Sequence, residues 1–122
     1  VDVICHLTAR LMERRAPVMM DITAVLEAAV RTGTVMEINS SPDRLDLKAD
    51  HVRRAVELGV KFAVNTDTHR TWQFGNIRFG IQTAVRGWVE EKSVINTLPF
   101  DRLKKFLEMP KSERYGFMNS RG

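Results

Sequence analysis

The sequence predicts an α/β fold in which parallel strands alternate with helices. Three short runs of β-branched and apolar residues are each followed by a segment with helical periodicity. This order is typical of a parallel sheet with right-handed crossovers. The composition, 43% hydrophobic and 28% charged over 122 residues, is that of one modest globular domain.

The first half of the chain supplies two of the strands. Residues 1–5 are expected to form a buried strand, followed by a long polar loop over residues 6–17. Asp21 can cap the next helix and Gly33 can end it. The apolar positions of that helix recur with the helical period: Ile22, Val25, Leu26, Ala29 and Val30. Residues 34–38 are expected to form the second strand, which leads into a loop rich in turn formers.

The second half continues the alternation. A helix opened by Asp46 or Lys48 should end before Gly59, and residues 60–64 should form the third strand. A third helix is expected over residues 76–88. Its apolar stripe consists of Ile77, Ile81, Ala84, Val85 and Trp88. Short helical segments are expected at residues 93–96 and 100–107.

The two ends of the chain differ from its middle. Residues 1–109 carry the alternating pattern, whereas residues 110–122 are expected to be a polar tail or linker with only Tyr115, Phe117 and Met118 to bury. The chain begins inside an expected strand, so we interpret it as a piece of a larger protein. The first strand would then have an unpaired edge, which favours self-association of the isolated chain.

Charge and cysteine content limit the classes of function. The formal charge of +4 and the pI near 9.6 favour anionic partners, although the basic residues are scattered and most can be solvated helix faces. No apolar run reaches membrane-spanning length, and the first residues are not a signal peptide, so no membrane partner is expected. The single cysteine excludes an internal disulfide and fits a cytoplasmic location.

Polar side chains follow each of the three expected strands. His6 closes the first, Asn39 the second, and Asp67 with His69 the third. The carboxyl ends of parallel strands meet at one edge of a sheet, where chemistry gathers. In extended backbone, positions i and i+2 face the same way, so Asp67 and His69 can converge on one metal ion. Glu37 shares the strand face of Asn39, either to support a ligand or as a buried, paired carboxylate.

Three stretches, DVICHLTAR (2–10), EINSSPDRLDL (37–47) and NTDTH (65–69), resemble the polymerase-and-histidinol-phosphatase (PHP) family. The resemblance covers residues 1–107. It is greatest to the C-terminal part of the PHP domain of bacterial and archaeal family X DNA polymerases, and it identifies residues 1–109 with that part. It implies the C-terminal portion of a distorted (β/α)7 TIM-like barrel, with up to three divalent ions at its C-terminal rim.

The same resemblance assigns metal-ligand roles to His6, Asp67 and His69. The expected cofactor is a cluster of zinc, manganese or iron ions, whose identity the ligand types do not fix. The other ligands of the family would lie before Val1, so the cluster is expected to be incomplete in this chain, and metal retention to be weak.

Three further residues are candidates for substrate binding. Arg10 and Arg44 can clamp phosphate, since guanidinium binds it bidentately, but ion pairs with Glu13 or Asp46 explain them equally well. Asn39 can bond substrate, orient a ligand or merely satisfy the turn.

The sequence departs from the family pattern at two positions of the loop after the first strand, and two aromatic residues follow the third strand. Leu7 stands where proline is common, and Ala9 stands where glycine is common before Arg10. Both changes affect the shape of the loop that carries Arg10. Trp72 and Phe74, beside the Asp-x-His pattern, can stack a base, although packing under the loop is favoured.

The resemblance implies a metal-dependent phosphoesterase in the larger protein. In the polymerase-linked branch this is a 3′→5′ exonuclease or DNA-end-processing module acting in DNA repair, with DNA and the upstream half of the PHP domain as partners. The alternatives are a stand-alone phosphatase of small phosphate monoesters and a non-catalytic scaffold module. The isolated chain is expected to be inactive.

Overall fold

The structure is a computed structural model and describes residues 1–120. Its centre is a three-stranded sheet made of β1 (Val3–Ile4), β2 (Val35–Asn39) and β3 (Phe62–Asn65), in that order. Both pairs of neighbouring strands are parallel, and helices connect them. The predicted α/β class with parallel strands is therefore confirmed.

β1 is shorter than the buried strand expected at residues 1–5. Only Val3 and Ile4 pair with β2, and both are half-buried. Val1 is exposed, and the backbone turns at His6, whose φ is 52°. A left-handed residue does not continue a strand, so the expected length and burial were wrong.

The helices begin and end close to where the sequence predicts them. α1 (Ile22–Thr32) is capped by Asp21, whose carboxylate accepts the Ala24 N–H at 3.0 Å. Gly33 and Gly59 follow α1 and α2 with φ of 63° and 86°, the left-handed conformation that favours glycine. The other helices are α2 (Ala49–Leu58), α3 (Ile77–Arg86), α4 (Phe100–Glu108) and α5 (Lys111–Asn119), with 3₁₀ turns η1 (Thr71–Asn76), η2 (Glu91–Ser93) and η3 (Ile95–Thr97). None of the helices over residues 1–120 is long and apolar enough to span a membrane.

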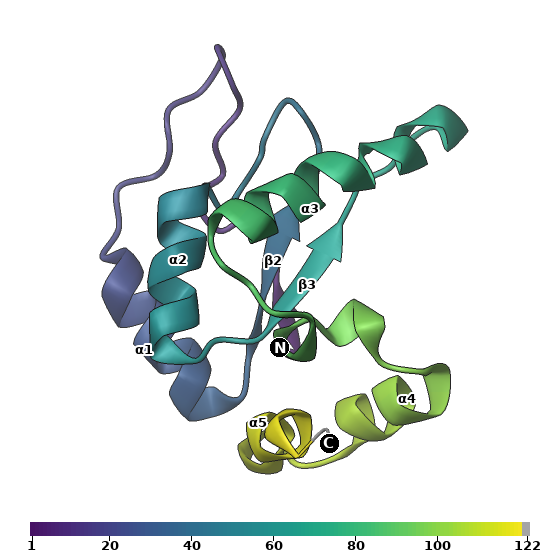
Figure 1. Ribbon diagram of the computed structural model, residues 1–122. Coiled ribbons are helices and arrows are strands. Elements are labelled where there is room, and N and C mark those ends of the chain that lie inside the picture. Colours follow the sequence, from purple (N-terminus) through teal and green to yellow (C-terminus); the bar gives the residue numbers. More distant parts are fainter. Residues whose placement is uncertain (121–122) are drawn as a thin grey trace.

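One face of the sheet is covered by α1, α2 and α3 (Figure 1). Alternate residues of β2 and β3 point into this layer, because side chains alternate between the two faces of a strand. The main core cluster comprises Leu26, Ala29, Met36, Ile38, Leu47, Val52, Ala55, Val60, Phe62, Val64, Ala84 and Val94. This apolar cluster anchors the three helices to the sheet.

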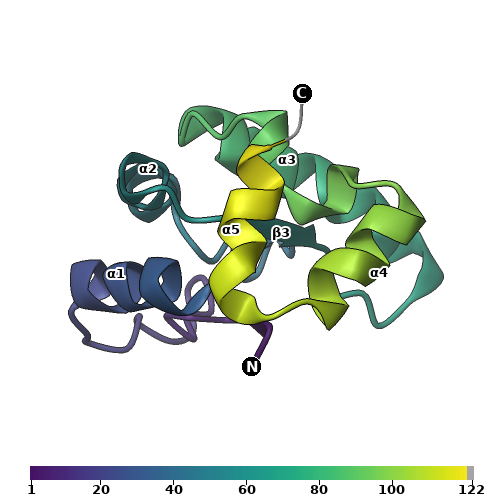
Figure 2. The same ribbon diagram turned by 90° about the horizontal axis from the view of Figure 1, so that it is seen from below.

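The other face of the sheet changes from apolar to polar along the strands. At the amino end, Val35 and Ala63 pack against residues of α4, α5 and η3, and Figure 2 shows α5 lying across this end of the molecule. At the carboxyl end the same face carries Glu37, Asn39 and Asn65, with Asn39 and Asn65 directly opposite each other. Polar groups are thus concentrated where the strands end.

The C-terminal stretch differs from the polar tail or linker expected at residues 110–122. α5 is a helix whose Met118 is fully buried in the second core. The Tyr115 hydroxyl donates to the Thr34 carbonyl at 2.6 Å, at the start of β2. A few apolar contacts and hydrogen bonds are enough to dock this helix on the sheet. Residues 121–122 lie outside the described part, and a domain boundary near residue 109 stays a prediction.

The outer edge of β3 is occupied by residues that follow α3. Phe62 forms a parallel bridge with Val94. The Asn96 side chain accepts the Val64 N–H at 2.8 Å and donates to the Val64 carbonyl at 3.0 Å, as a neighbouring strand would. The described strands therefore form an open sheet of three, and the larger barrel stays a prediction.

The apolar stripe expected on the third helix is only partly packed. Ala84 is buried in the main core, but Ile81 and Val85 are 51% and 66% exposed. Trp88 lies beyond the end of α3 with φ of 64°, and the guanidinium of Arg53 stacks 3.6 Å from its ring centroid. Its ring therefore packs on a charged side chain and not in the core.

Candidate functional site

Three polar side chains meet at the carboxyl edge of the sheet. Nε2 of His6 lies 3.8 Å from Oδ2 of Asp67. Nδ2 of Asn39 lies 3.1 Å from Nδ1 of His6 and 3.4 Å from Oδ2 of Asp67. The residues come from the ends of β1, β2 and β3, so parallel strands bring together side chains that are far apart in the sequence.

Glu37 anchors this group from inside the sheet. Its side chain is only 4% exposed, and its Oε2 accepts the backbone N–H of His6 at 3.1 Å. Its Oε1 accepts an N–H of the Asn65 side chain at 3.0 Å. A buried carboxylate needs such donors. Of the two alternatives for Glu37, burial with partners is observed, and support of a metal ligand stays a prediction.

Asn65 was missed in the sequence. It sits two residues before Asp67, on the strand face that also carries Ala63, so the period-two alternation of β3 could have revealed it. Its amide holds Glu37, which in turn holds the backbone of His6.

Asn39 is oriented by its neighbours. Its Oδ1 accepts the Ser41 N–H at 2.9 Å, which directs the amide nitrogen toward His6, Glu37 and Asp67. Two amide protons already face three acceptors, and Asn39 is fully buried. This geometry favours orientation of the neighbouring side chains over direct contact with a substrate.

Two of the six described non-glycine residues with positive φ belong to this group. His6 and Asp67 have φ of 52° and 54°, which is uncommon for residues other than glycine. Such conformations cost about 1–3 kcal/mol each and are found at functional sites, where the surroundings hold them in place.

Arg44 and Arg10 have different surroundings. Nε of Arg44 donates to Oδ2 of Asp67 at 3.2 Å, and its side chain is largely buried. Arg10 instead donates to backbone carbonyls, from Nε to Arg44 at 2.7 Å and from Nη2 to Leu45. Neither forms the ion pair with Glu13 or Asp46 that the sequence left open. Arg44 faces the site, whereas Arg10 fixes the loop that carries it.

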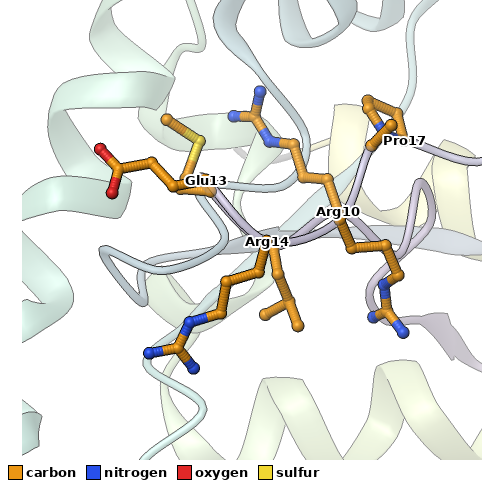
Figure 3. Close-up of a pocket in the computed structure, with 8 residues that line it drawn as sticks. Arg10, Glu13, Arg14 and Pro17 are labelled. Atoms are coloured by element: carbon orange, nitrogen blue, oxygen red, sulfur yellow. The ribbon is translucent and has the colours of Figure 1, made fainter.

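Arg10 begins a hairpin that stands apart from this group. Leu11 and Arg15 pair, with the Leu11 N–H donating to the Arg15 carbonyl at 3.0 Å. The segment borders an open cavity of about 380 Å³, and Figure 3 shows Arg10, Glu13, Arg14 and Pro17 around it. All of its lining residues come from positions 10–17. Since this cavity includes none of the converging polar side chains, we place the site at the sheet edge.

His69 is more exposed than His6 and contacts only the backbone and carboxylate of Asp67 among the site residues. Its side chain is 78% exposed, and its Nδ1 donates to the Asp67 carbonyl at 2.7 Å. Nδ1 of His69 lies 3.9 Å from Oδ1 of Asp67, whereas His6 lies nearest to the other carboxylate oxygen, Oδ2. The backbone at Asp67 is left-handed and not extended as expected, yet the two side chains lie close together, and their convergence on one metal ion stays a prediction.

Cys5 lies beside the site and not in the core, where packing was expected. Desolvation of its sulfur and then the nearby carboxylate of Glu37 raise the pKa of the thiol to about 11. Cys5 is therefore a thiol at neutral pH and a poor metal ligand in this state.

The fit to a metal ion is partial. Imidazole and carboxylate are suitable donors for zinc, manganese or iron. Within residues 1–120, however, no three His, Cys, Asp or Glu side chains gather around one point. His6 with Asp67, and His69 with Asp67, make two pairs that share one carboxylate. These residues can contribute part of a coordination shell, which ordinarily needs four or more ligands.

Comparison with known proteins relates the chain to two kinds of protein. It is 39% identical over 108 residues, 88% of its length, to the DNA polymerase/3'-5' exonuclease PolX of Bacillus subtilis (strain 168), of which the match covers 19%. It is 30% identical over 98 residues, 75% of its length, to probable phosphatases of Thermoanaerobacter sp. (strain X514) and Thermoanaerobacter pseudethanolicus, covering 40% of each. No family profile matches the chain. The chain thus spans about a fifth of the polymerase and two fifths of the phosphatases.

Proposed function

We propose that the chain is the C-terminal part of a PHP phosphoesterase domain, and that its parent is a family X DNA polymerase that trims 3′ ends during DNA repair in the cytoplasm. The observation that carries this proposal is the pairing of His6 and Asp67 at 3.8 Å, at the carboxyl edge of a parallel sheet. The 39% identity to PolX supports the polymerase-linked branch. The three strands would then belong to a larger (β/α)7 barrel completed by the rest of the protein.

In this proposal His6 and Asp67 would hold part of a divalent metal cluster, and His69, whose Nδ1 lies 3.9 Å from Oδ1 of Asp67, would supply a further ligand. The remaining ligands would come from other parts of the parent protein. Bound cations of this kind neutralise charge on a phosphoryl oxygen and activate water. Asn39 and Glu37 would fix the imidazole and the backbone of His6, because their hydrogen bonds already restrain both.

Arg44 is the better candidate for a phosphate-binding residue. Only its Nε is engaged, by Asp67, so its terminal nitrogens have no other partner in the part of the chain described. A guanidinium held in this way can donate two further hydrogen bonds to a phosphate. Arg10 would act indirectly, by holding the loop of Arg44 through the carbonyls of Arg44 and Leu45.

The similarity to probable phosphatases keeps a second candidate open, a phosphatase of small monoesters. The test is to assay the protein encoded by the complete reading frame, with manganese, on a 5′-labelled single-stranded oligonucleotide and on p-nitrophenyl phosphate. The proposal predicts stepwise shortening of the oligonucleotide and little release of nitrophenol. Hydrolysis of p-nitrophenyl phosphate alone would favour the phosphatase. Hydrolysis of neither substrate would favour a non-catalytic scaffold module.

The isolated chain should not hydrolyse the oligonucleotide, because it carries only part of the proposed ligands. Activity of the 122-residue chain that disappears on Asp67→Ala would contradict this expectation.

A further inference from the structure

His69 is held by hydrogen bonds at its ring and at its backbone. Its Nδ1 lies 2.7 Å from the carbonyl oxygen of Asp67, two residues earlier in the chain. Its backbone N–H donates to Oε1 of Gln73 at 2.8 Å. The side chain is 78% exposed, so packing contributes little to its position. The placement of this histidine therefore depends on polar contacts.

The hydrogen bond at the ring determines which nitrogen is available to a ligand. A carbonyl oxygen can only accept, so the proton of the neutral imidazole of His69 is on Nδ1. Nε2 then carries the free lone pair. Metal-binding histidines commonly donate one ring N–H to a backbone carbonyl or a carboxylate, which fixes the tautomer and the direction of the other nitrogen. The bond to Asp67 has this form.

The hydrogen bond at the backbone comes from one glutamine of η1. Oε1 of Gln73 accepts the N–H of Arg70 at 3.0 Å as well as that of His69. In return, the Gln73 N–H donates to the Arg70 carbonyl at 2.9 Å. This reciprocal pattern is a capping box at the first turn of η1. It restrains the backbone of His69 while its ring bonds to Asp67.

η1 has little apolar packing that could replace these hydrogen bonds. Trp72 is 69% and Phe74 is 64% exposed, so the packing under the loop that the sequence favoured was wrong, and the stacking of a base on them stays a prediction. η1 contributes no buried residue to the two cores. The position of His69 relative to η1 consequently depends on the side chain of Gln73.

We propose that Gln73 is a positioning residue that holds His69 as the Nδ1-protonated tautomer and thereby presents Nε2 to a metal ion. The statement on the tautomer depends only on the hydrogen bonds of this chain. The statement on the metal rests on the proposed function. Gln73 itself would touch neither metal nor substrate.

The first experiment determines the tautomer of His69 in the ¹⁵N-labelled 122-residue chain. Two-bond ¹H–¹⁵N correlations of the ring are recorded at about pH 8.5, where imidazole is neutral. The chain has three histidines, and the signals that disappear in His69→Asn identify this one. Wild type should show the Nδ1–H tautomer. Gln73→Met keeps the approximate shape of the side chain but removes the acceptor, so it should shift His69 to the Nε2–H tautomer that histidine favours in water.

Two further variants separate a specific effect of Gln73 from a general one. Gln73→Glu retains an acceptor oxygen and should restore the wild-type tautomer. Gln82→Met is the matched control, since Gln82 is exposed on α3, outside η1, and should leave the tautomer unchanged. The signals of His6 and His51 should be the same in every variant, which distinguishes a local change from unfolding. An Nε2–H tautomer of His69 in wild type, or an unchanged Nδ1–H tautomer in Gln73→Met, would overturn the inference.

Hydrogen exchange of the backbone tests the same contact without any variant. The amides of His69 and Arg70 should be protected in wild type, because both donate to Gln73. Gln73→Met should remove this protection. Unprotected amides in wild type would overturn the inference even if Gln73→Met does not fold.

The second experiment concerns the metal and uses the protein encoded by the complete reading frame. Its affinity for zinc, measured by competition with a chelator, should fall about tenfold in Gln73→Met, as is typical when a group that orients a metal ligand is lost. Gln82→Met should stay within about twofold of wild type. A changed tautomer of His69 with an unchanged zinc affinity would contradict the presentation of Nε2 to a metal. A wild-type protein that binds no zinc would refute the metal part together with the proposed function, whereas the result on the tautomer would stand.

Discussion

Nε2 of His6 and Oδ2 of Asp67 lie 3.8 Å apart, although the two residues belong to strands that are not neighbours in the sheet. β2 lies between those strands and fills the space with Asn39, whose amide nitrogen is within 3.4 Å of both side chains. The site is therefore a layer of hydrogen-bonded groups across three strand ends. Its geometry depends on the central residue as much as on the outer two.

Asn39→Asp should damage the fold at this point. The change is isosteric, but it places a third carboxylate against Glu37 and Asp67 and removes the amide donor to His6. We expect the free energy of unfolding to fall by about 3 kcal/mol, the order of cost for an uncompensated buried charge. Urea denaturation followed by circular dichroism measures it.

Asn76→Asp is the matched control for that substitution. Asn76 precedes α3 and makes no side-chain capping bond, and a carboxylate at a helix N-terminus is favourable. Stability should stay the same or rise by a few tenths of a kcal/mol. An equal loss of stability in both variants would show that Asn39 has no special role.

Ala9→Gly should stabilise the chain. Ala9 has φ of 52°, a conformation that costs an alanine about 1–2 kcal/mol and glycine almost nothing. Part of that gain is offset by the greater freedom of glycine in the unfolded chain, so we expect a net increase of up to about 1 kcal/mol. Thermal and urea denaturation measure the difference.

Ala16→Gly in the same segment is the control, since Ala16 has no positive φ. It should lower stability by about 0.4–1 kcal/mol. If Ala9→Gly is also destabilising, the left-handed turn before Arg10 is not present in solution.

Gly80→Ala should be destabilising despite the better helix propensity of alanine. A Cβ at this position would lie 2.0 Å from Oγ of Ser40 and 2.8 Å from Cγ1 of Val64, so α3 would have to move off the sheet. Forced overpacking of this kind costs about 1–3 kcal/mol. Gly116→Ala in α5 meets nothing within 4 Å and should raise stability by up to about 1 kcal/mol. The urea denaturation midpoints of the two variants should therefore shift in opposite directions from that of wild type. A stabilising Gly80→Ala would rule out the close approach of Gly80 to Ser40 and Val64.

Tyr115 reports whether α5 is docked. Burial raises the pKa of its phenol to about 12, an effect opposed by the Lys61 N–H that donates to it. The folded state therefore binds the phenol proton more tightly than the unfolded chain, whose pKa is near 10. The stability that comes from this difference is complete below pH 10 and is lost as the pH rises from 10 to 12. As the chain has one tyrosine, tyrosinate absorbance measures the midpoint without ambiguity. A midpoint near 10 would mean that residues 110–120 are the tail that composition first indicated.

The sequence predicts the strand and helix order well because periodicity and caps are local signals. Asp21, Gly33 and Gly59 each mark a helix end, and the structure confirms all three. The C-terminal helix was missed because its burial depends on few apolar residues and on polar anchors. Arg114 is buried, and its Nη1 donates to Asp2 at 2.6 Å from the other end of the chain, a pairing that no local pattern reveals.

The composition of the site was also predictable only in part. Alternation along parallel strands places His6, Asn39 and Asp67 at one edge, and the structure brings them together. The left-handed backbone of Asp67 and the hydrogen bond between the His69 ring and the Asp67 carbonyl were not predictable, because residue spacing does not indicate a positive φ. The partners of Arg10 and Arg44 likewise depend on how two loops fold against each other.

The central claim is that Asp67 takes part in phosphoester hydrolysis in the parent protein. The most direct measurement is manganese-dependent shortening of a 5′-labelled oligonucleotide by the full-length protein, compared among wild type, Asp67→Asn and Asp43→Asn. Asp43 is an exposed carboxylate on the neighbouring loop and serves as the control. We expect Asp67→Asn to lower the rate of shortening by about a hundredfold or more, as is typical when a group that stabilises transition-state charge is lost. Asp43→Asn should leave this rate unchanged. An Asp67→Asn protein as active as wild type would contradict the claim.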